Sequence, residues 1–261
     1  MPRQPPQKER DAMRVVIQED YRKMCKWAAD YIAARIKTHR EDRPFVLGLP
    51  TGSPPIGVYQ ELVRQNRAGE LSFANVVTFN MDEYLGLPRK HDQSYWHFMH
   101  DNFFNHLTDM KPENINILNG MTDDPEGECA RYDAVIDSFG GADLQLLGLG
   151  PNGHVGFNEP ADAFVKNTNK VKLTDATIDA NARFFANRDE VPRYAYTMGI
   201  GGIMKAKRVL LVVNGKAKAQ AVKDCFFGPI RPQAPGSILQ LHPDFTLVAD
   251  EDALSLVKDL L

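Results

Sequence analysis

Seven short apolar runs recur along the chain, and longer amphipathic stretches separate them. Three of the runs, FVLGL, LQLLGL and VLLVV, are apolar without polar alternation, which is typical of strands buried on both faces. Strands that alternate with helix-sized segments form mostly parallel sheets with helices on both faces. The sequence therefore predicts an α/β fold of this kind, with strands at 14–17, 45–49, 75–79, 114–118, 144–149, 208–213 and 245–249.

The domain organisation follows from length and local composition. A chain of 261 residues, 43% of them hydrophobic, suits a single domain, which we place at 14–261. The polar, proline-rich start predicts a disordered tail at 1–13. Residues 160–192 are polar and carry no convincing strand, so we expect a lid insertion there. Thr174 before Asp175 is a helix-start signal, which predicts a helical, mobile lid.

Charge and cysteine content exclude several classes of partner. The net charge is -3, without a long run of one sign, so we expect no nucleic-acid or membrane-surface patch. No apolar run approaches the roughly 18 residues that a membrane span needs. The three cysteines are far apart and form no C-x-x-C pair, and the histidines show no metal-ligand spacing, so we predict no disulfide framework and no metal. These features favour a small-molecule partner and a reducing cytoplasm.

Ligands of open parallel sheets bind at the carboxyl ends of the strands, so site residues are expected directly after the apolar runs. After the run at 45–49 comes Pro50-Thr51-Gly52-Ser53-Pro54 and then a helical pattern. Small and hydroxyl residues at a helix amino end expose N–H groups that bind phosphate. An ordinary turn with Ser53 as N-cap and Pro54 as the first helical residue explains the same pattern at least as well.

A pair of acidic residues, Asp82 and Glu83, comes soon after the run at 75–79. Desolvation at the floor of a cleft raises the pKa of a carboxylate towards the range where it can take and return a proton. The alternative is that Asp82 caps the next element and Glu83 is solvated. Tyr84 and Leu85 suggest a loop that packs inward, which favours Asp82 as a base.

The segment at 144–160, LQLLGLGPNGHVGFNEP, is the most specific in the chain. Its glycines match G-x-G-x-x-G, but the residues from His154 to Pro160 oppose the helix that a dinucleotide site needs, so we reject that interpretation. We expect the glycines to project His154 into the cleft as a proton shuttle, with Glu159 to orient it. A hydrogen-bonded structural histidine is the alternative.

Basic residues for an anionic substrate have to come from elsewhere in the chain. Arg183 in the expected lid and Lys218 after the run at 208–213 are reasonable suppliers. Either side chain could equally face solvent, because lysine and arginine are mostly surface residues.

Taken together, these segments resemble the glucosamine-6-phosphate deaminase family, and the resemblance covers most of the chain. FNMDEY and GHVGFNEP, in this order and at this separation, are far more specific than any single motif. The resemblance implies a Rossmann-like, doubly wound sheet and a sugar-phosphate enzyme without a cofactor. The matching segments are LGLPTGSPP, VVTFNMDEYLGLP, SYWHFMHDNFF, ENINILNG, LGLGPNGHVGFNEP, NARFF and SILQLHPDFTLVAD.

The resemblance also implies a role for each matching position. Asp82 matches the family's base at C1 and C2, His154 its ring-opening histidine, and Glu159 the carboxylate partner of that histidine. Asn152 stands where some members have an aspartate that helps to hold the histidine, so Glu159 should carry more of that task here. The phosphate-binding positions are Thr51, Gly52, Ser53, Arg183 and Lys218.

The implied activity is conversion of glucosamine 6-phosphate to fructose 6-phosphate and ammonia, a step of amino-sugar catabolism. Activated members place basic residues early in the lid, whereas this chain has Asn169 and Val171, so we expect no activation by N-acetylglucosamine 6-phosphate. Members of this type are often oligomeric, and a homo-oligomer is compatible with the resemblance. A 6-phosphogluconolactonase-like hydrolase and a non-catalytic sugar-phosphate sensor are the alternatives.

Overall fold

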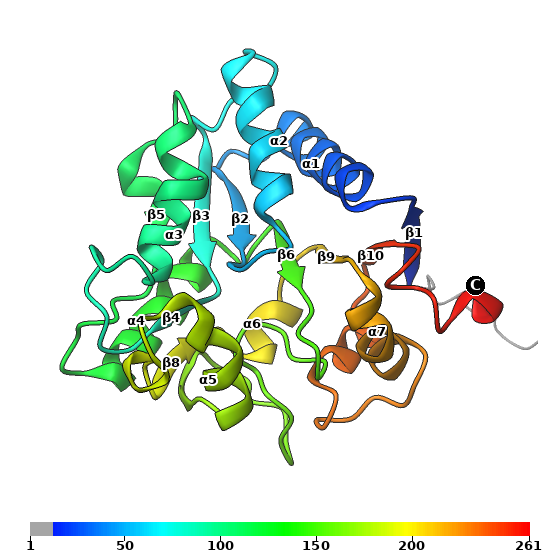
Figure 1. The fold of residues 1–261 in the computed structure, drawn as a ribbon. Helices are drawn as coiled ribbons and strands as arrows, with labels where there is room; N and C mark the ends of the chain where they lie inside the picture. The colour runs from blue at the N-terminus through cyan, green and yellow to red at the C-terminus, as the bar shows by residue number, and fades with distance from the viewer. Residues whose placement is uncertain (1–12) are drawn as a thin grey trace, which may run out of the picture.

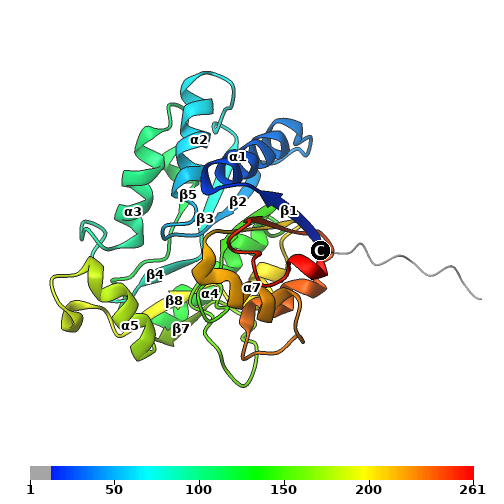
Figure 2. The same ribbon diagram turned by 45° about the vertical axis from the view of Figure 1, so that its right-hand side comes forward.

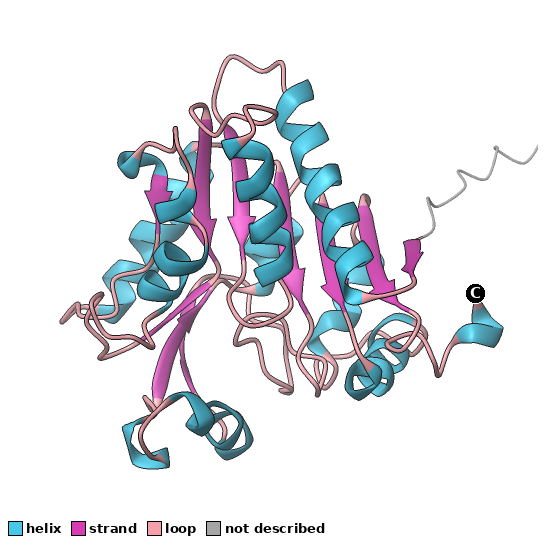
Figure 3. Ribbon diagram, turned by 45° about the horizontal axis from the view of Figure 1, so that its top comes forward, coloured by secondary structure: helices cyan, strands magenta, loops and turns pink. Residues whose placement is uncertain are grey.

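A seven-stranded sheet forms the centre of the protein in a computed structural model, which describes residues 13–261 (Figure 1). All neighbouring strands in this sheet run parallel, and Figure 3 shows their arrowheads at the same end. Each of the seven predicted runs is a strand, so this part of the prediction is confirmed; the expected tail at 1–13 falls almost wholly outside the described residues. In spatial order the strands are β1 (Arg14–Gln18), β10 (Phe245–Asp250), β9 (Val209–Val213), β6 (Leu144–Gly148), β2 (Phe45–Leu49), β3 (Val76–Asn80) and β5 (Ile115–Asn116).

Helices cover both faces of the sheet, as the apolar runs predicted. Successive side chains of a strand point to opposite faces, so Val46 packs into one core and Leu47 into the other. The Leu47 side holds α1 (Tyr21–Thr38), α2 (Ile56–Arg67) and α3 (Tyr95–Asn102), and Figures 1 and 2 both show α1 beside α2. The Val46 side holds α4 (Pro125–Ser138), α6 (Ile200–Met204) and α7 (Ala219–Phe226). Short 3-10 turns occur at Phe104–His106, Pro112–Asn114, Ala182–Phe184, Arg188–Glu190, Lys216–Lys218, Pro235–Leu241 and Lys258–Leu260.

A second, antiparallel sheet lies beyond the carboxyl ends of the large one, and the sequence did not predict it (Figure 3). It consists of β4 (Asp82–Tyr84), β8 (Tyr194–Thr197) and β7 (Asn169–Lys172). The expectation that 160–192 contains no strand is therefore wrong, because β7 pairs with β8 along its whole length. The expected helix start is confirmed, since Thr174 caps α5 (Asp175–Asn181) by accepting from the N–H of Thr177.

The strand order changes direction between β2 and β6. From β2 the chain continues outward to β3 and β5, then returns to the other side of β2 as β6 and continues outward to β9 and β10. The carboxyl ends of two strands that flank such a switch point enclose a crevice, which is the usual ligand site of open α/β sheets. The fold therefore places the segments after β2 and β6 beside one ligand site.

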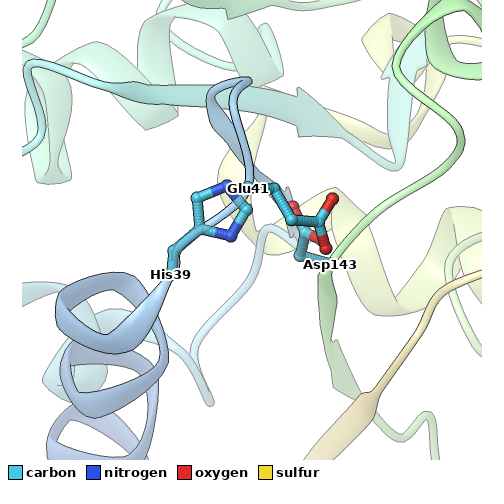
Figure 4. Close-up of side chains that lie close together, drawn as sticks. All are labelled: His39, Glu41 and Asp143. Atoms are coloured by element: carbon cyan, nitrogen blue, oxygen red, sulfur yellow. The ribbon is translucent and has the colours of Figure 1, made fainter.

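A charged cluster joins the amino ends of β2 and β6, at the end of the strands opposite the expected ligand site (Figure 4). His39, Glu41 and Asp143 place ligand-type atoms within 4.8 Å of one another, which is a geometry that metal sites share. Here both carboxylates already have cationic partners. Arg43 donates to both oxygens of Asp143, at 2.8 and 2.5 Å, and Lys207 pairs with Glu41. We therefore interpret the cluster as an ion-pair network that aligns the two strands.

Replacing Asp143 with Asn should destabilise the protein. Asp143 is 2% exposed and accepts from the backbone N–H of Val46 as well as from Arg43, so the variant leaves the partly buried guanidinium of Arg43 with Glu41 as its remaining carboxylate partner. Loss of such a charged hydrogen bond costs about 2 kcal/mol of unfolding free energy, which urea denaturation measures. Asp137→Asn is the control, because its ion pair with Lys205 is half exposed. Equal losses in the two variants would contradict the assigned role of Asp143.

Candidate active site

Three segments meet at the carboxyl ends of β2, β3 and β6. The turn at 50–55 comes after β2, Asp82 after β3, and the loop at 149–160 after β6. Met81 donates its N–H to the carbonyl of Leu49 at 3.1 Å, which joins the first two segments. Gly156 brings the third segment close, because a Cβ atom there would lie 3.4 Å from Oδ2 of Asp82. Asp82, the predicted base, therefore lies close to both the turn at 50–55 and the loop at 149–160.

Asp82 is buried rather than turned into solvent, with 5% of its surface exposed. It begins β4 and pairs in register with Thr197 of β8, so it does not cap a helix and that alternative is wrong. Burial, assisted by the charge of Glu83, raises the pKa of Asp82 to about 8, although a 3.5 Å contact from Oγ1 of Thr51 opposes the shift. A carboxylate with such a pKa can both accept and return a proton near neutral pH.

Glu83 has the capping role that the sequence analysis considered for Asp82. Its carboxylate accepts from the N–H groups of Tyr84, Tyr95 and Trp96, each at 2.8 Å, and the last two begin α3. Burial raises the pKa of Glu83 to about 7 although these three donors oppose the shift. The expectation of a solvated Glu83 is thus wrong, because the side chain is 2% exposed and fixes α3 against β4.

The turn after β2 offers backbone donors for an anion. Helix α2 begins at Ile56 after Pro55, without a side-chain cap, so the alternative with Ser53 as N-cap and Pro54 as first helical residue is wrong. Within residues 13–261, the N–H groups of Thr51, Gly52 and Ser53 donate to no protein acceptor. Three neighbouring free N–H groups near a helix amino end form the kind of site that phosphate prefers.

His154 lies in a network that connects the loop after β6 with helix α5. Its Nδ1 lies 3.4 Å from Oε1 of Glu159, and that same oxygen accepts from the hydroxyl of Thr177 at 2.6 Å. Asn152 donates to the other oxygen of Glu159 at 2.7 Å and accepts from the N–H of His154 at 3.2 Å. Gly150 makes room for the imidazole, since a Cβ atom there would lie 2.2 Å from Nε2 of His154. Nδ1 of His154 has no hydrogen-bond partner in the described chain, so the ring is held near Glu159 by the 3.4 Å approach alone, and its orientation by Glu159 stays a prediction.

Glu159 stays ionised in this network. Its burial raises the pKa, but the contact with His154 and the hydrogen bonds from Thr177 and Asn152 outweigh burial and lower the pKa to about 2. The carboxylate therefore offers a fixed negative charge beside the imidazole throughout the neutral range.

Arg183 lies close enough to Lys218 for its charge to act on the lysine, and in the described chain no hydrogen bond joins either side chain to residues 51–53. Arg183 is exposed, and its guanidinium lies 4.6 Å from the centre of the Phe184 ring. Lys218 is half-buried at the start of α7, and burial together with the positive charge of Arg183 lowers its pKa. Two cations that repel each other are suited to an anion that binds between them.

The comparisons with known proteins identify the family of this chain. A model of the family described as glucosamine-6-phosphate isomerases/6-phosphogluconolactonase matches residues 19–247. The chain belongs to this family. It is 48% identical to a glucosamine-6-phosphate deaminase of Thermoanaerobacter pseudethanolicus over 95% of this chain and 96% of that protein. It is 50% identical to a glucosamine-6-phosphate deaminase of Clostridioides difficile over 93% of this chain and 96% of that protein.

Solved structures of the family share the fold. A monomeric glucosamine-6-phosphate deaminase, 45% identical, superimposes with a TM-score of 0.89 over 94% of this chain and all of the other. A 6-phosphogluconolactonase from Thermotoga maritima, 18% identical, superimposes with a TM-score of 0.73 over 91% of this chain and 99% of the other, which shows the fold alone. The predicted family and α/β fold are thus confirmed. No helix in the described part of this family member is long and apolar enough to cross a bilayer.

A cavity of about 290 Å³ opens on the far side of Glu159. Glu159 and Thr174 line it, as do Asn169 and Val171 of β7, but Asp82 and the turn at 51–53 do not. The carboxyl ends of β2, β3 and β6 remain our candidate active site, because the buried Asp82 and the free N–H groups of residues 51–53 lie there.

The sequence analysis missed Thr177 and the capping role of Glu83. Thr177 gives a weak signal, because it stands three positions after the cap Thr174, where a capping box has Glu or Gln. Its bond to Glu159 spans 18 residues and depends on how α5 folds back, which no local pattern indicates.

Asp82→Asn should raise thermal stability at pH 9 and leave it nearly unchanged at pH 4. Folding raises the pKa of Asp82 to about 8, so its contribution to stability is complete below the unfolded pKa near 4 and is lost as pH rises through 8. The neutral amide avoids that loss. Melting curves of both proteins from pH 4 to 9 test this, with Asp101→Asn as the exposed-aspartate control. Parallel curves for wild type and Asp82→Asn would contradict the shifted pKa.

Thr177→Val should lower kcat about tenfold. The substitution keeps the shape of the side chain but removes the donor that holds Oε1 of Glu159 at 2.6 Å. A tenfold loss corresponds to roughly 1.4 kcal/mol, within the range for one hydrogen bond to a charged group. Steady-state kinetics measure the effect, and Thr177→Ser should retain most of the activity because it keeps the hydroxyl. A serine variant as slow as the valine variant would assign Thr177 a packing role instead.

Proposed function

We propose that this protein converts glucosamine 6-phosphate and water to fructose 6-phosphate and ammonia, as a hydrolase of amino-sugar catabolism. The observation that carries the proposal is the buried Asp82, whose pKa near 8 suits a base that removes a carbon-bound proton and returns it. The names of the similar deaminases from two bacteria support the same substrate. The reaction needs no external oxidant, because the aldose carbon is reduced while its neighbour is oxidised.

The first step is opening of the sugar ring, since no proton next to a carbonyl can be removed before C1 becomes an aldehyde. His154 moves the proton between the C1 hydroxyl and the ring oxygen in this proposal. The charge of Glu159 at 3.4 Å stabilises the imidazolium form of His154 during the transfer. Asn152 holds both partners but adds no charge, so Glu159 alone has that electrostatic role.

The second step is the proton transfer by Asp82. The carboxylate takes the C2 proton of the open chain, and the electron pair forms the C1–C2 double bond while the C1 carbonyl oxygen takes a proton from the C2 ammonium group. The product of this step is an enolamine. Asp82 returns the proton to C1, which leaves an imine at C2. Water hydrolyses the imine to the ketone of fructose 6-phosphate and releases the nitrogen as ammonia. One carboxylate serves both transfers because C1 and C2 are adjacent.

The phosphate group anchors the substrate far from the reacting carbons. We propose that Thr51, Gly52 and Ser53 bind it through their free N–H groups, with charge compensation from Arg183 and Lys218. We also propose that residues 160–192 act as a lid, because this segment supplies both Arg183 and the donor Thr177. Binding energy at the phosphate then orients the open chain over Asp82.

The alternatives fit the site less well. Hydrolysis of a lactone has no use for a base at C2, and the likeness to 6-phosphogluconolactonases concerns the fold alone. A binding-only sensor would need the phosphate turn but not a buried carboxylate, which costs stability at high pH. Neither alternative therefore accounts for Asp82.

We further propose that the enzyme works in the cytoplasm on small molecules alone. Its three cysteines are free and buried, which suits a reducing compartment. A homo-oligomer stays a prediction, and the similar monomeric deaminase shows that this fold also occurs as a single chain.

The test is an assay of ammonia and fructose 6-phosphate formed from glucosamine 6-phosphate, beside an assay of 6-phosphogluconolactone hydrolysis. We expect ammonia and fructose 6-phosphate in equal amounts and no lactone hydrolysis above background. Asp82→Asn should lower kcat at least about 100-fold and change substrate affinity little, because it removes the base but keeps the shape of the side chain.

The control for this experiment is Asp101→Asn, an exposed aspartate of α3. It should keep wild-type turnover. Preferential hydrolysis of the lactone would refute the proposed function. Near-normal turnover by Asp82→Asn would refute Asp82 as the base.

A further inference from the structure

The hydroxyl of Tyr21 reaches from helix α1 to the turn after β2. It accepts from the N–H of Gly57 at 2.9 Å and lies 3.2 Å from the carbonyl oxygens of both Ser53 and Pro54. These three groups span the last part of the turn and the first part of α2. One side chain, more than 30 residues away in sequence, thus contacts the whole junction between turn and helix.

Helix α2 has no cap of its own. Pro55 stands at its N-cap position, and neither Pro54 nor Pro55 has an N–H group. The hydroxyl of Tyr21 accepts from Gly57 and so replaces the missing side-chain cap. The close approach of the two helices depends on Gly57, because a Cβ atom there would lie 2.6 Å from Sγ of Cys25 and 3.1 Å from the hydroxyl oxygen of Tyr21.

The same hydroxyl fixes the backbone of the turn. A hydroxyl has one proton to donate and shares it between the carbonyls of Ser53 and Pro54. Burial raises the pKa of Tyr21 to about 12, so the donor persists across the neutral range. The turn at 50–55 contains three prolines, and the N–H groups of Thr51, Gly52 and Ser53 make no hydrogen bond within the described chain. Besides Tyr21, the turn is held by the Ile56 N–H on the carbonyl of Ser53, by the Tyr59 hydroxyl on the carbonyl of Pro50, and by the long contact of Thr51 with Asp82.

We propose that Tyr21 is a positioning residue for phosphate binding: its hydroxyl holds the turn at 51–54 so that the three free N–H groups converge on the phosphate of the substrate. The proposal rests on the proposed function, because it assigns the phosphate to this turn. Tyr21 itself does not touch the substrate in this role. Its effect is on binding and not on the proton transfer, which takes place at Asp82.

The test is Tyr21→Phe, which keeps the ring and removes only the hydroxyl. We expect the Kd for inorganic phosphate, measured by titration calorimetry, to rise about tenfold. The KM for glucosamine 6-phosphate should rise by a similar factor while kcat changes less than twofold. Tyr31→Phe is the matched control, since this tyrosine lies on the same helix with its ring stacked on Trp27, and it should bind phosphate like wild type.

Two outcomes would overturn the proposal. If Tyr21→Phe melts at a lower temperature but binds phosphate as wild type does, Tyr21 only stabilises the fold. If kcat falls and the phosphate affinity stays constant, Tyr21 acts on another step.

Lys218→Met separates this proposal from the proposed function. Suppose that wild type binds phosphate and Lys218→Met does not. If Tyr21→Phe then binds phosphate as wild type does, the role of Tyr21 alone is refuted. If wild type and Lys218→Met bind phosphate equally well, the proposed phosphate site itself is wrong.

Discussion

The burial of the Asp82 carboxylate is the constraint on which the rest of the site depends. Asp82 and Glu83 are adjacent and both buried, yet their surroundings differ. Glu83 accepts three backbone hydrogen bonds, whereas Asp82 has one long contact from Thr51. Because adjacent residues of a strand point to opposite sides, one carboxylate fixes helix α3 and the other is left for the substrate. Asp82 is thus a buried carboxylate with few hydrogen-bond donors, at the position where we expect the ligand.

The large sheet provides the rigidity that such a site needs. Its strands β2 and β6 flank the switch point, and both are almost completely buried. The Asp143 network joins their amino ends, and the bond from Met81 to Leu49 joins β2 to the start of β4. The turn, the base and the histidine loop therefore extend from strands that cannot slide relative to one another. This arrangement holds reacting groups in place without requiring order in the exposed segments.

The sequence predicted the elements whose signals are local. Seven apolar runs became seven strands, and FNMDEY with GHVGFNEP identified the family, whereas the roles of the site residues stay predictions. The errors concern contacts between distant segments. Strand β7 has one apolar residue, Val171, and forms only because β8 pairs with it. The alternative with Ser53 as N-cap is wrong because α2 begins only after Pro55, and the hydroxyl of Tyr21, from another helix, accepts from its first turn. The bond from Thr177 to Glu159 likewise depends on the path of the chain between them.

Asn152 affects the electrostatics of the histidine side of the site. An aspartate at this position would place a second negative charge beside Glu159, and like charges raise the pKa of a carboxylate. With the amide, Glu159 receives a hydrogen bond instead of repulsion, and its pKa stays near 2. The carboxylates of Glu159 and Asp82 then differ in their pKa. In the proposed mechanism, Glu159 keeps its charge and stabilises a transient imidazolium, whereas Asp82 gains and loses a proton in each turnover.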